Sequence, residues 1–180
     1  MTIRFHKNDL PDLSNYNVDA VAIDTETLGL KPHRDRLCVV QLSPGDGTAD
    51  VVQIDAGQKK APNLVALLKN RKIAKLFHYA RFDLAVLYHS FGVMPEPVFC
   101  SKIASRLTLT YTDRHGLKDL CNELLGVSLS KAQQSSDWAA EELTPEQLEY
   151  AASDVLYLHQ LREKLNERLA REKRTREAEA

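Results

Sequence analysis

Short apolar runs bounded by turn residues dominate the first third of the chain. Asn17–Asp24, Leu37–Ser43 and Asp50–Asp55 are brief and rich in Val, Ala, Ile and Leu, which is typical of buried strands. Pro44-Gly45-Asp46-Gly47 joins the second run to the third and is a strong turn signal. The pattern therefore predicts three strands in succession.

Helical and strand-like segments then alternate. The expected helices cover Pro62–Asn70, Ala80–Phe91, Lys102–Leu109 and Gly116–Leu125, and the expected strands cover Lys72–His78 and Val98–Cys100. Sequential strands followed by alternating helices and strands predict an α/β domain with a mixed sheet and helices on both faces.

A further helix has a clear beginning. Thr144 suits the N-cap, Pro145 suits the first helical position, and Gln147 can complete a capping box. Its apolar stripe comprises Leu148, Ala151, Ala152, Val155 and Leu158.

The last stretch, Arg162–Ala180, carries many charges of both signs and predicts a solvated helix. We separate residues 1–170 as the folded domain from residues 171–180 as a charged helical tail. A basic RNA-binding tail is the sharper alternative, which the interspersed glutamates weaken.

Four acids in three separated motifs are the main candidates for chemistry. Asp24 and Glu26 follow an apolar run and, two residues apart on a strand, would face the same side. Asp83 falls in the first turn of an expected helix, where the helix dipole alone would favour a carboxylate. Asp154 lies four residues after Tyr150 on a largely apolar helix face, where an unpaired aspartate is costly to bury.

Each motif alone has a plainer explanation, as solvated acids or as a surface aspartate beside a core tyrosine. Together, four acids with no obvious cation partner favour a site for two hard divalent metal ions, Mg²⁺ or Mn²⁺, and thus phosphodiester chemistry.

The order Asp24-x-Glu26, Asp83, Tyr150-x-x-x-Asp154 resembles the DEDDy class of 3′→5′ exonucleases, the ribonuclease D-like group. The segments RDRLCVVQLS, SSDWAAE and YAASDVLYLH are similar to the nano-RNase C type of small oligoribonuclease. The resemblance implies an RNase H-like, DnaQ-like exonuclease fold over residues 1–170. Members of that family continue past the position of Ala180, so a shortened C-terminus is expected.

The resemblance also implies roles for these residues. Asp24 would bridge two metal ions, Glu26 and Asp154 would complete the first site, and Asp83 would support the second. Tyr150 would orient the attacking water, since a phenol with a pKa near 10 is a poor base at neutral pH. The product would be a nucleoside 5′-monophosphate.

Substrate-binding candidates rest on weaker signals. Leu30 resembles a leucine that wedges between the last two bases, with Leu28 as the alternative and core packing possible for either. Phe82 could flank the site, although core packing is its default. Charge and loop position suggest a contact with a 5′ phosphate for Arg81, Arg114, His115, Lys131 and Gln134, although a surface role is the favoured interpretation for each taken singly. Thr27 and His78 complete the set of candidates.

Composition limits the alternatives. The chain has 180 residues, a net charge of −1 and a pI near 6.6, so it does not coat nucleic acid through bulk positive charge. No phosphate-binding glycine loop or zinc-type spacing is present. Three cysteines without metal spacing, Cys38, Cys100 and Cys121, predict free thiols and a reducing, cytoplasmic location.

The expected function is metal-dependent 3′→5′ degradation of short oligoribonucleotides, down to dinucleotides. Trimming of structured RNA, as by ribonuclease D, and hydrolysis of DNA are alternatives. A catalytically dead nucleic-acid-binding module is a further one, which the presence of all five catalytic-type residues opposes. The resemblance implies a homo-oligomer, an octamer, as the assembled form.

Overall fold

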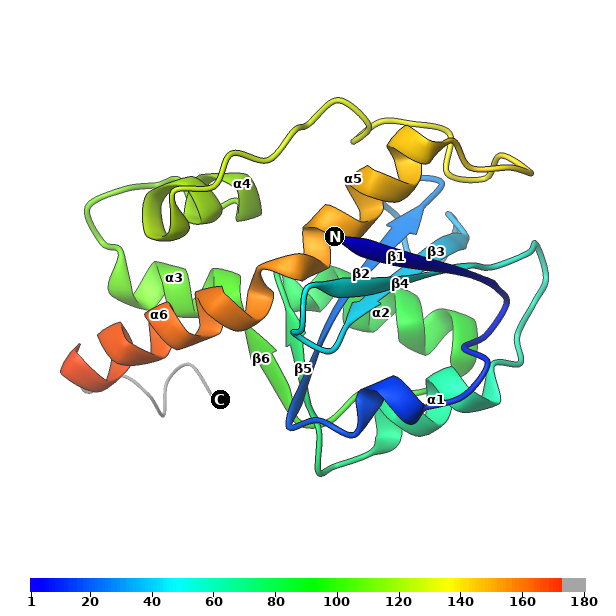
Figure 1. Ribbon diagram of the computed structural model, residues 1–180, viewed down its shortest axis with the longest axis horizontal. Coiled ribbons are helices and arrows are strands. Elements are labelled where there is room, and N and C mark those ends of the chain that lie inside the picture. The colour runs from blue at the N-terminus through cyan, green and yellow to red at the C-terminus, as the bar shows by residue number, and fades with distance from the viewer. Residues whose placement is uncertain (173–180) are drawn as a thin grey trace.

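The computed structural model describes residues 1–172 and is built on a six-stranded mixed sheet (Figure 1). The strand order is β1-β4-β3-β2-β5-β6. The strands are β1 (Thr2–Lys7), β2 (Ala20–Thr27), β3 (Leu37–Ser43), β4 (Thr48–Gln53), β5 (Ala74–Phe77) and β6 (Val98–Cys100). β3 is antiparallel to both of its neighbours, β2 and β4. β1 is parallel to β4. The remaining three strands, β2, β5 and β6, are parallel to one another.

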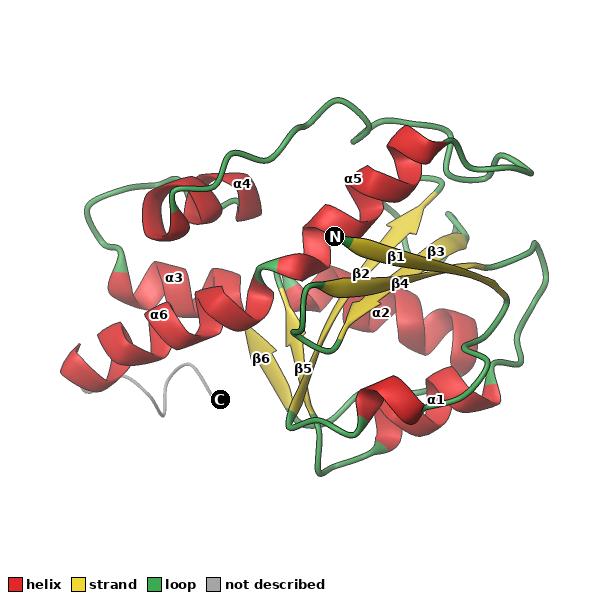
Figure 2. Cartoon of the chain, in the orientation of Figure 1, coloured by secondary structure: helices red, strands yellow, loops and turns green. Residues whose placement is uncertain are grey.

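Helices flank this sheet, so the expected α/β class is confirmed (Figure 2). The helices are α1 (Pro62–Lys69), α2 (Ala80–Phe91), α3 (Ser101–Thr108), α4 (Leu117–Leu120), α5 (Pro145–Leu156) and α6 (Leu158–Glu172). A 3-10 turn covers Ser14–Tyr16, and a π-helical turn at Cys121–Leu125 continues α4.

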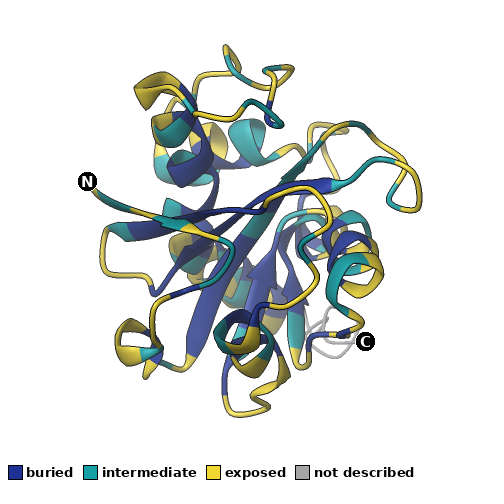
Figure 3. Cartoon of the chain, turned by 90° about the vertical axis from the view of Figure 1, so that its right-hand side faces the viewer, coloured by how far each residue is buried: buried dark blue, intermediate teal, exposed yellow. Residues whose placement is uncertain are grey.

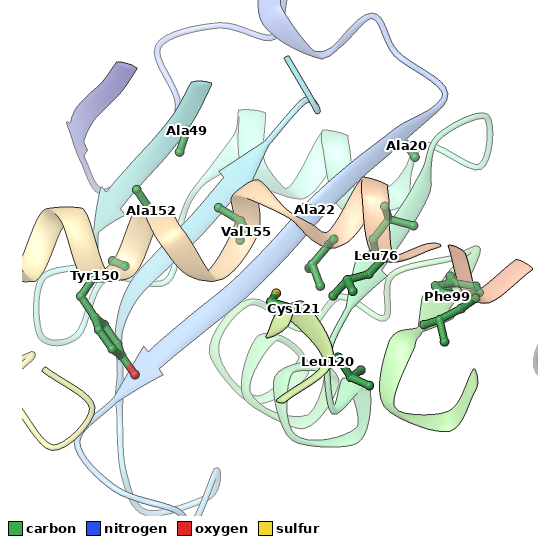
Figure 4. Close-up of a cluster of buried hydrophobic side chains, with 14 of the residues drawn as sticks. Ala20, Ala22, Ala49, Leu76, Phe99, Leu120, Cys121, Tyr150, Ala152 and Val155 are labelled. Atoms are coloured by element: carbon green, nitrogen blue, oxygen red, sulfur yellow. The ribbon is translucent and has the colours of Figure 1, made fainter. Parts of the chain in front are cut away.

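Successive side chains of the central strands point to opposite faces of the sheet and pack in two separate hydrophobic cores. Ala22 of β2 packs with α3, α5 and α6, whereas its neighbours Val21 and Ile23 pack with α1 and α2 on the other side. Figure 4 shows the first core, and Figure 3 shows the buried sheet surrounded by more exposed helices and loops. This two-sided burial explains why the strands are almost continuously apolar.

Most expected boundaries agree with the structure, but β2 does not. It begins at Ala20 and continues to Thr27, whereas Asn17–Asp24 was expected. Pairing with β3 carries the strand through its polar residues, because Glu26 lies opposite Val39 in the antiparallel ladder. Asp24 and Glu26 are therefore held within the sheet, toward the end of its central strand.

The edge strand β1 was not expected from the sequence. Its side chains are mostly exposed or half-buried, so it carries no strong apolar signal. Side chains of β1 instead contact Asp50, a buried residue on β4 that is distant in the sequence: Arg4 Nε lies 2.9 Å and His6 Nε2 lies 2.7 Å from Oδ1 of Asp50.

The helix that begins at Pro145 ends at Leu156, and α6 follows it after a break at Tyr157. The expectation of a purely solvated stretch from Arg162 is wrong for α6, because Leu165 and Leu169 are fully buried in the first core. The expected tail at 171–180 lies almost wholly outside the described residues.

All three cysteines are buried free thiols, as expected. No helix within residues 1–172 is long and apolar enough to cross a membrane.

Candidate active site

β2 presents two acids on one face near its end. Asp24 and Glu26 are both partly buried, and the strand's alternation places Thr25 between them on the opposite face. Gln41 of β3 donates a hydrogen bond from Nε2 to Oε1 of Glu26 at 3.3 Å. The sheet thus holds both carboxylates before any ligand arrives.

α5 brings a third acid to the same point. The helix begins with the expected capping box: Thr144 Oγ1 accepts from Gln147 N at 3.1 Å, and Gln147 Oε1 accepts from Thr144 N at 2.9 Å. Asp154 follows nearly three turns later. Asp24, Glu26 and Asp154 each offer an oxygen, and these oxygens lie within 4.8 Å of one another.

Asp83 is held apart from these three acids. It lies in the first turn of α2, is buried, and accepts a hydrogen bond from Thr25 Oγ1 at 2.6 Å. The group of three carboxylates does not include it. Its negative charge nevertheless acts on Asp24, so four acids share one electrostatic environment.

Burial and mutual repulsion raise the pKa values of these acids. Burial, with added repulsion from Asp154, raises the pKa of Glu26 to about 8. Burial also raises the pKa of Asp83 to about 8, against the opposing hydrogen bond from Thr25. Burial and the charges of its three acidic neighbours raise the pKa of Asp24 well above its ordinary value. The positive charge present at the site is therefore not sufficient to keep the pKa values of these carboxylates in their ordinary range.

A cation partner does exist, contrary to the sequence expectation. Lys118 on α4 places Nζ 3.9 Å from Oδ1 of Asp154 and 3.4 Å from Oη of Tyr150. Burial raises the pKa of Asp154 to about 6, and the lysine opposes that rise. Burial and then the charge of Asp154 raise the pKa of the Tyr150 phenol, so this group is protonated at neutral pH.

A cleft of about 320 Å³ opens over the acids. Three substrate-binding candidates line it, namely His78, Lys131 and Gln134, together with Tyr150. Burial lowers the pKa of His78 to about 4. The His78 ring is neutral at neutral pH, and its Nδ1 lies 2.8 Å from Oγ of Ser101.

The other substrate-binding candidates lie away from the cleft lining. Leu30 is 86% exposed and Leu28 is 56% exposed, so core packing is wrong for both. Phe82 packs against the second core, which was its default expectation. Arg81, Arg114, His115 and Thr27 are not among the cleft-lining residues of the described chain. His115 Nδ1 instead lies 2.5 Å from Oγ of Ser105, and Thr27 donates to the carbonyl of Gly29.

The acids fit a hard divalent cation. Carboxylate oxygens are the ligands that Mg²⁺ and Mn²⁺ prefer. Oδ1 of Asp154 is buried and has no hydrogen-bond partner in the described chain, which is costly unless a cation compensates it. Asp24, Glu26 and Asp154 are the residues that could hold an ion directly.

A mixed sheet with carboxylates converging near the end of its central strand, and a tyrosine one helical turn before the last of them, defines a nuclease of the DnaQ-like exonuclease fold. Residues 9–170 match the model of the 3′-5′ exonuclease family, and the chain belongs to this family. The expected fold and family are therefore confirmed.

Among solved structures, the chain is similar to Brucella melitensis NrnC. The structure of NrnC with bound Mg²⁺ is 74% identical, with a TM-score of 0.96 over 99% of this chain and 87% of that one. NrnC bound to pGG is 75% identical, with a TM-score of 0.97 and the same coverage. These likenesses agree with the resemblance to the nano-RNase C type.

Ribonuclease D enzymes are more distant relatives. The chain is 39% identical to ribonuclease D of Acidiphilium cryptum over 157 residues, which is 86% of this chain. It spans only 39% of the length of that relative. Escherichia coli RNase D is 29% identical, with a TM-score of 0.78 over 92% of this chain and 43% of that one.

Sequence reasoning missed Lys118, Thr25 and Gln41, all of which contact the predicted site residues. Lys118 lies 36 residues before Asp154, so no local spacing connects the two. Thr25 had a usable signal, since it stands between two site acids and must face the opposite side of the strand.

Proposed function

We propose that this chain is a metal-dependent 3′→5′ exoribonuclease that degrades short oligonucleotides, down to dinucleotides, to nucleoside 5′-monophosphates. The observation that carries the proposal is the convergence of three carboxylate oxygens within 4.8 Å of one another at the cleft. The Mg²⁺ bound to the NrnC relative supports the same interpretation.

Asp24, Glu26 and Asp154 would hold the first ion, with Asp24 shared by a second that Asp83 supports. When bound, the ions would supply Lewis-acid activation of the attacking water and charge stabilisation of the leaving 3′ oxygen. The raised carboxylate pKa values fit this arrangement, because positive charge at the site would favour the ionised forms.

Tyr150 would orient the attacking water by hydrogen bonding. Tyr150 is 8% exposed and its ring centroid lies 5.9 Å from that of Trp138, so the hydroxyl has a defined position at the cleft. The raised pKa of the phenol argues against a role as general base. Lys131 and Gln134 line the same cleft and would bind substrate phosphate and sugar groups.

The net charge of −1 supports a short substrate, because the chain has little overall positive charge with which to attract a long polyanion. The pGG bound to the NrnC relative is itself a short ligand. The exposed Leu30 would lie between the last two bases, and Lys131, the cationic candidate that lines the cleft, would contact the 5′ phosphate. We also propose a cytoplasmic location and assembly into an octamer.

Trimming of structured RNA is the second candidate. The likeness to Escherichia coli RNase D, described as an exoribonuclease involved in structured RNA processing, favours it. The likeness to NrnC bound to pGG, at 75% identity, favours the short-substrate proposal instead. DNA remains a possible substrate class, because no described contact selects a 2′-hydroxyl.

The direct test is product analysis on 5′-labelled single-stranded RNA and DNA, with Mg²⁺, Mn²⁺ or EDTA. We expect stepwise loss of nucleoside 5′-monophosphates from the 3′ end, dependent on metal and absent in Asp24→Asn. Undiminished cleavage in EDTA would refute the metal-dependent mechanism. Binding without hydrolysis under every metal condition would instead favour the dead binding module.

A further inference from the structure

Lys118 stands at the wall of the cleft beside both functional side chains of α5. Its Nζ lies 3.4 Å from Oη of Tyr150 and 5.0 Å from the centre of that ring, as well as 3.9 Å from Oδ1 of Asp154. The lysine side chain is only 16% exposed. One ammonium group thus bridges two residues that are one helical turn apart.

The contact with Tyr150 is the closer of the two. A separation of 3.9 Å is too long for a hydrogen bond, and Oδ1 of Asp154 has no hydrogen-bond partner in the described chain. The 3.4 Å contact with the phenol is a long hydrogen bond. An ion pair with Asp154 therefore does not fully account for the position of Lys118.

The chemistry of the two groups fixes the direction of this hydrogen bond. An ammonium group can only donate, so Oη of Tyr150 is the acceptor. The phenol's own proton is then free to point into the cleft. The ring centroids of Trp138 and Tyr150 lie 5.9 Å apart, so the indole packs against the tyrosine ring and fixes its position. Lys118 occupies one side of the Tyr150 hydroxyl.

We propose that Lys118 is a positioning residue that acts through Tyr150, holding the phenol so that its proton is directed toward the water or phosphate in the cleft. This inference rests on the proposed exonuclease function. It predicts that the contribution of Lys118 to turnover exists only while the Tyr150 hydroxyl is present.

A double-mutant cycle tests this dependence. Lys118→Met is made in the unaltered chain and in Tyr150→Phe, and single-turnover rates on a short RNA are measured over a range of RNA concentrations with saturating Mg²⁺. We expect Lys118→Met to lower the maximal rate on the order of 10-fold, with little change in the half-saturating concentration. In the Tyr150→Phe background, it should cause no further loss.

Two further variants separate positioning from packing and charge. Lys118→Arg keeps a cationic donor and should recover part of the rate. Lys164→Met removes one positive charge from an exposed position on α6 and should leave the rate unchanged. Thermal unfolding of each variant shows whether it is folded, and Lys118→Leu, which also lacks a donor, replaces Lys118→Met if that variant does not fold.

The outcomes are distinct. An unaltered chain without nuclease activity overturns the proposed function, and the inference with it. An active chain in which Lys118→Met loses the same factor in both backgrounds overturns the inference alone, because Lys118 would then act directly on substrate or metal. An unchanged rate in Lys118→Met also overturns it.

Discussion

Thr25 Oγ1 donates a 2.6 Å hydrogen bond to Oδ1 of Asp83, which joins the central strand to the first turn of α2 inside the protein. Because Thr25 alternates with Asp24 and Glu26, the same strand that presents two acids to the cleft also fixes the fourth from the opposite face. The position of Asp83 apart from the other three acids follows from this bond.

Removing the hydroxyl should therefore weaken both fold and site. We expect Thr25→Val to lower the free energy of unfolding by about 1–3 kcal/mol, since a buried carboxyl group loses its donor. Activity should fall as well, because Asp83 is no longer fixed. Urea unfolding and single-turnover rates measure the two effects. Thr108→Val is the control: it removes a buried hydroxyl that donates to Ala104 O on α3, away from the acids, so activity should persist.

Two aspartates, Asp24 and Asp50, should respond to amide substitution in opposite directions. Asp24 lies among like charges, so Asp24→Asn should abolish activity yet raise the melting temperature of the metal-free protein. Asp50 is paired with Arg4, His6 and Tyr16, so Asp50→Asn should lower the free energy of unfolding by about 3–5 kcal/mol. Melting curves in EDTA measure both, and a destabilised Asp24→Asn would contradict the account of the acids.

The raised pKa values predict how the stability of the metal-free protein depends on pH. Glu26 and Asp83, with pKa values of about 8, retain protons that the unfolded chain has already lost above its pKa near 4. The folded state then binds more protons, so stability falls as pH rises. His78, with its pKa lowered to about 4, acts in the opposite direction only below about pH 6.5.

The effect of Glu26 and Asp83 on stability is therefore best measured between pH 6.5 and 8, where His78 does not oppose it. In EDTA, the free energy of unfolding should fall there by on the order of 1 kcal/mol per pH unit. Saturating Mg²⁺ should remove most of this slope, because metal ligands are deprotonated in the bound state. Urea titrations at pH 6.5 and 8 measure it, and a stability that is flat or rising in EDTA would contradict the assignment.

Leu30 offers a test of substrate contact that is separate from folding. Because its side chain is 86% exposed, Leu30→Ala should leave the melting temperature unchanged. If Leu30 stacks between the last two bases, the substitution should cost about 1–3 kcal/mol of binding, with similar losses for RNA and DNA because stacking does not read the sugar. Leu28→Ala is the matched control, and an equal loss in both variants would argue against a single wedge.

Local patterns were enough to place the acids. The two-residue spacing of Asp24 and Glu26 indicates a shared strand face, and the four-residue spacing of Tyr150 and Asp154 indicates a shared helix face. The structure places these three acids and the tyrosine along one cleft. The antiparallel pairing with β3 that carries β2 to Thr27 could not be predicted locally, because it depends on a partner strand.

Contacts between distant segments escaped prediction. Lys118 reaches Tyr150 across 32 residues, and the edge strand β1 depends on Asp50, which lies 46 residues after Arg4. Neither relationship has a periodic signal. The catalytic and substrate-binding roles of the named residues stay predictions.

The preference for very short substrates is the central claim, and one comparison tests it most directly. Single-turnover rates are measured with Mg²⁺ on a 5′-phosphorylated dinucleotide, the same dinucleotide without its 5′ phosphate, and a longer RNA of the same 3′ sequence. We predict the fastest hydrolysis for the phosphorylated dinucleotide, because under this proposal it would gain a charge-assisted contact at its 5′ end. Equal rates on all three substrates would contradict the account and indicate a general 3′→5′ exonuclease.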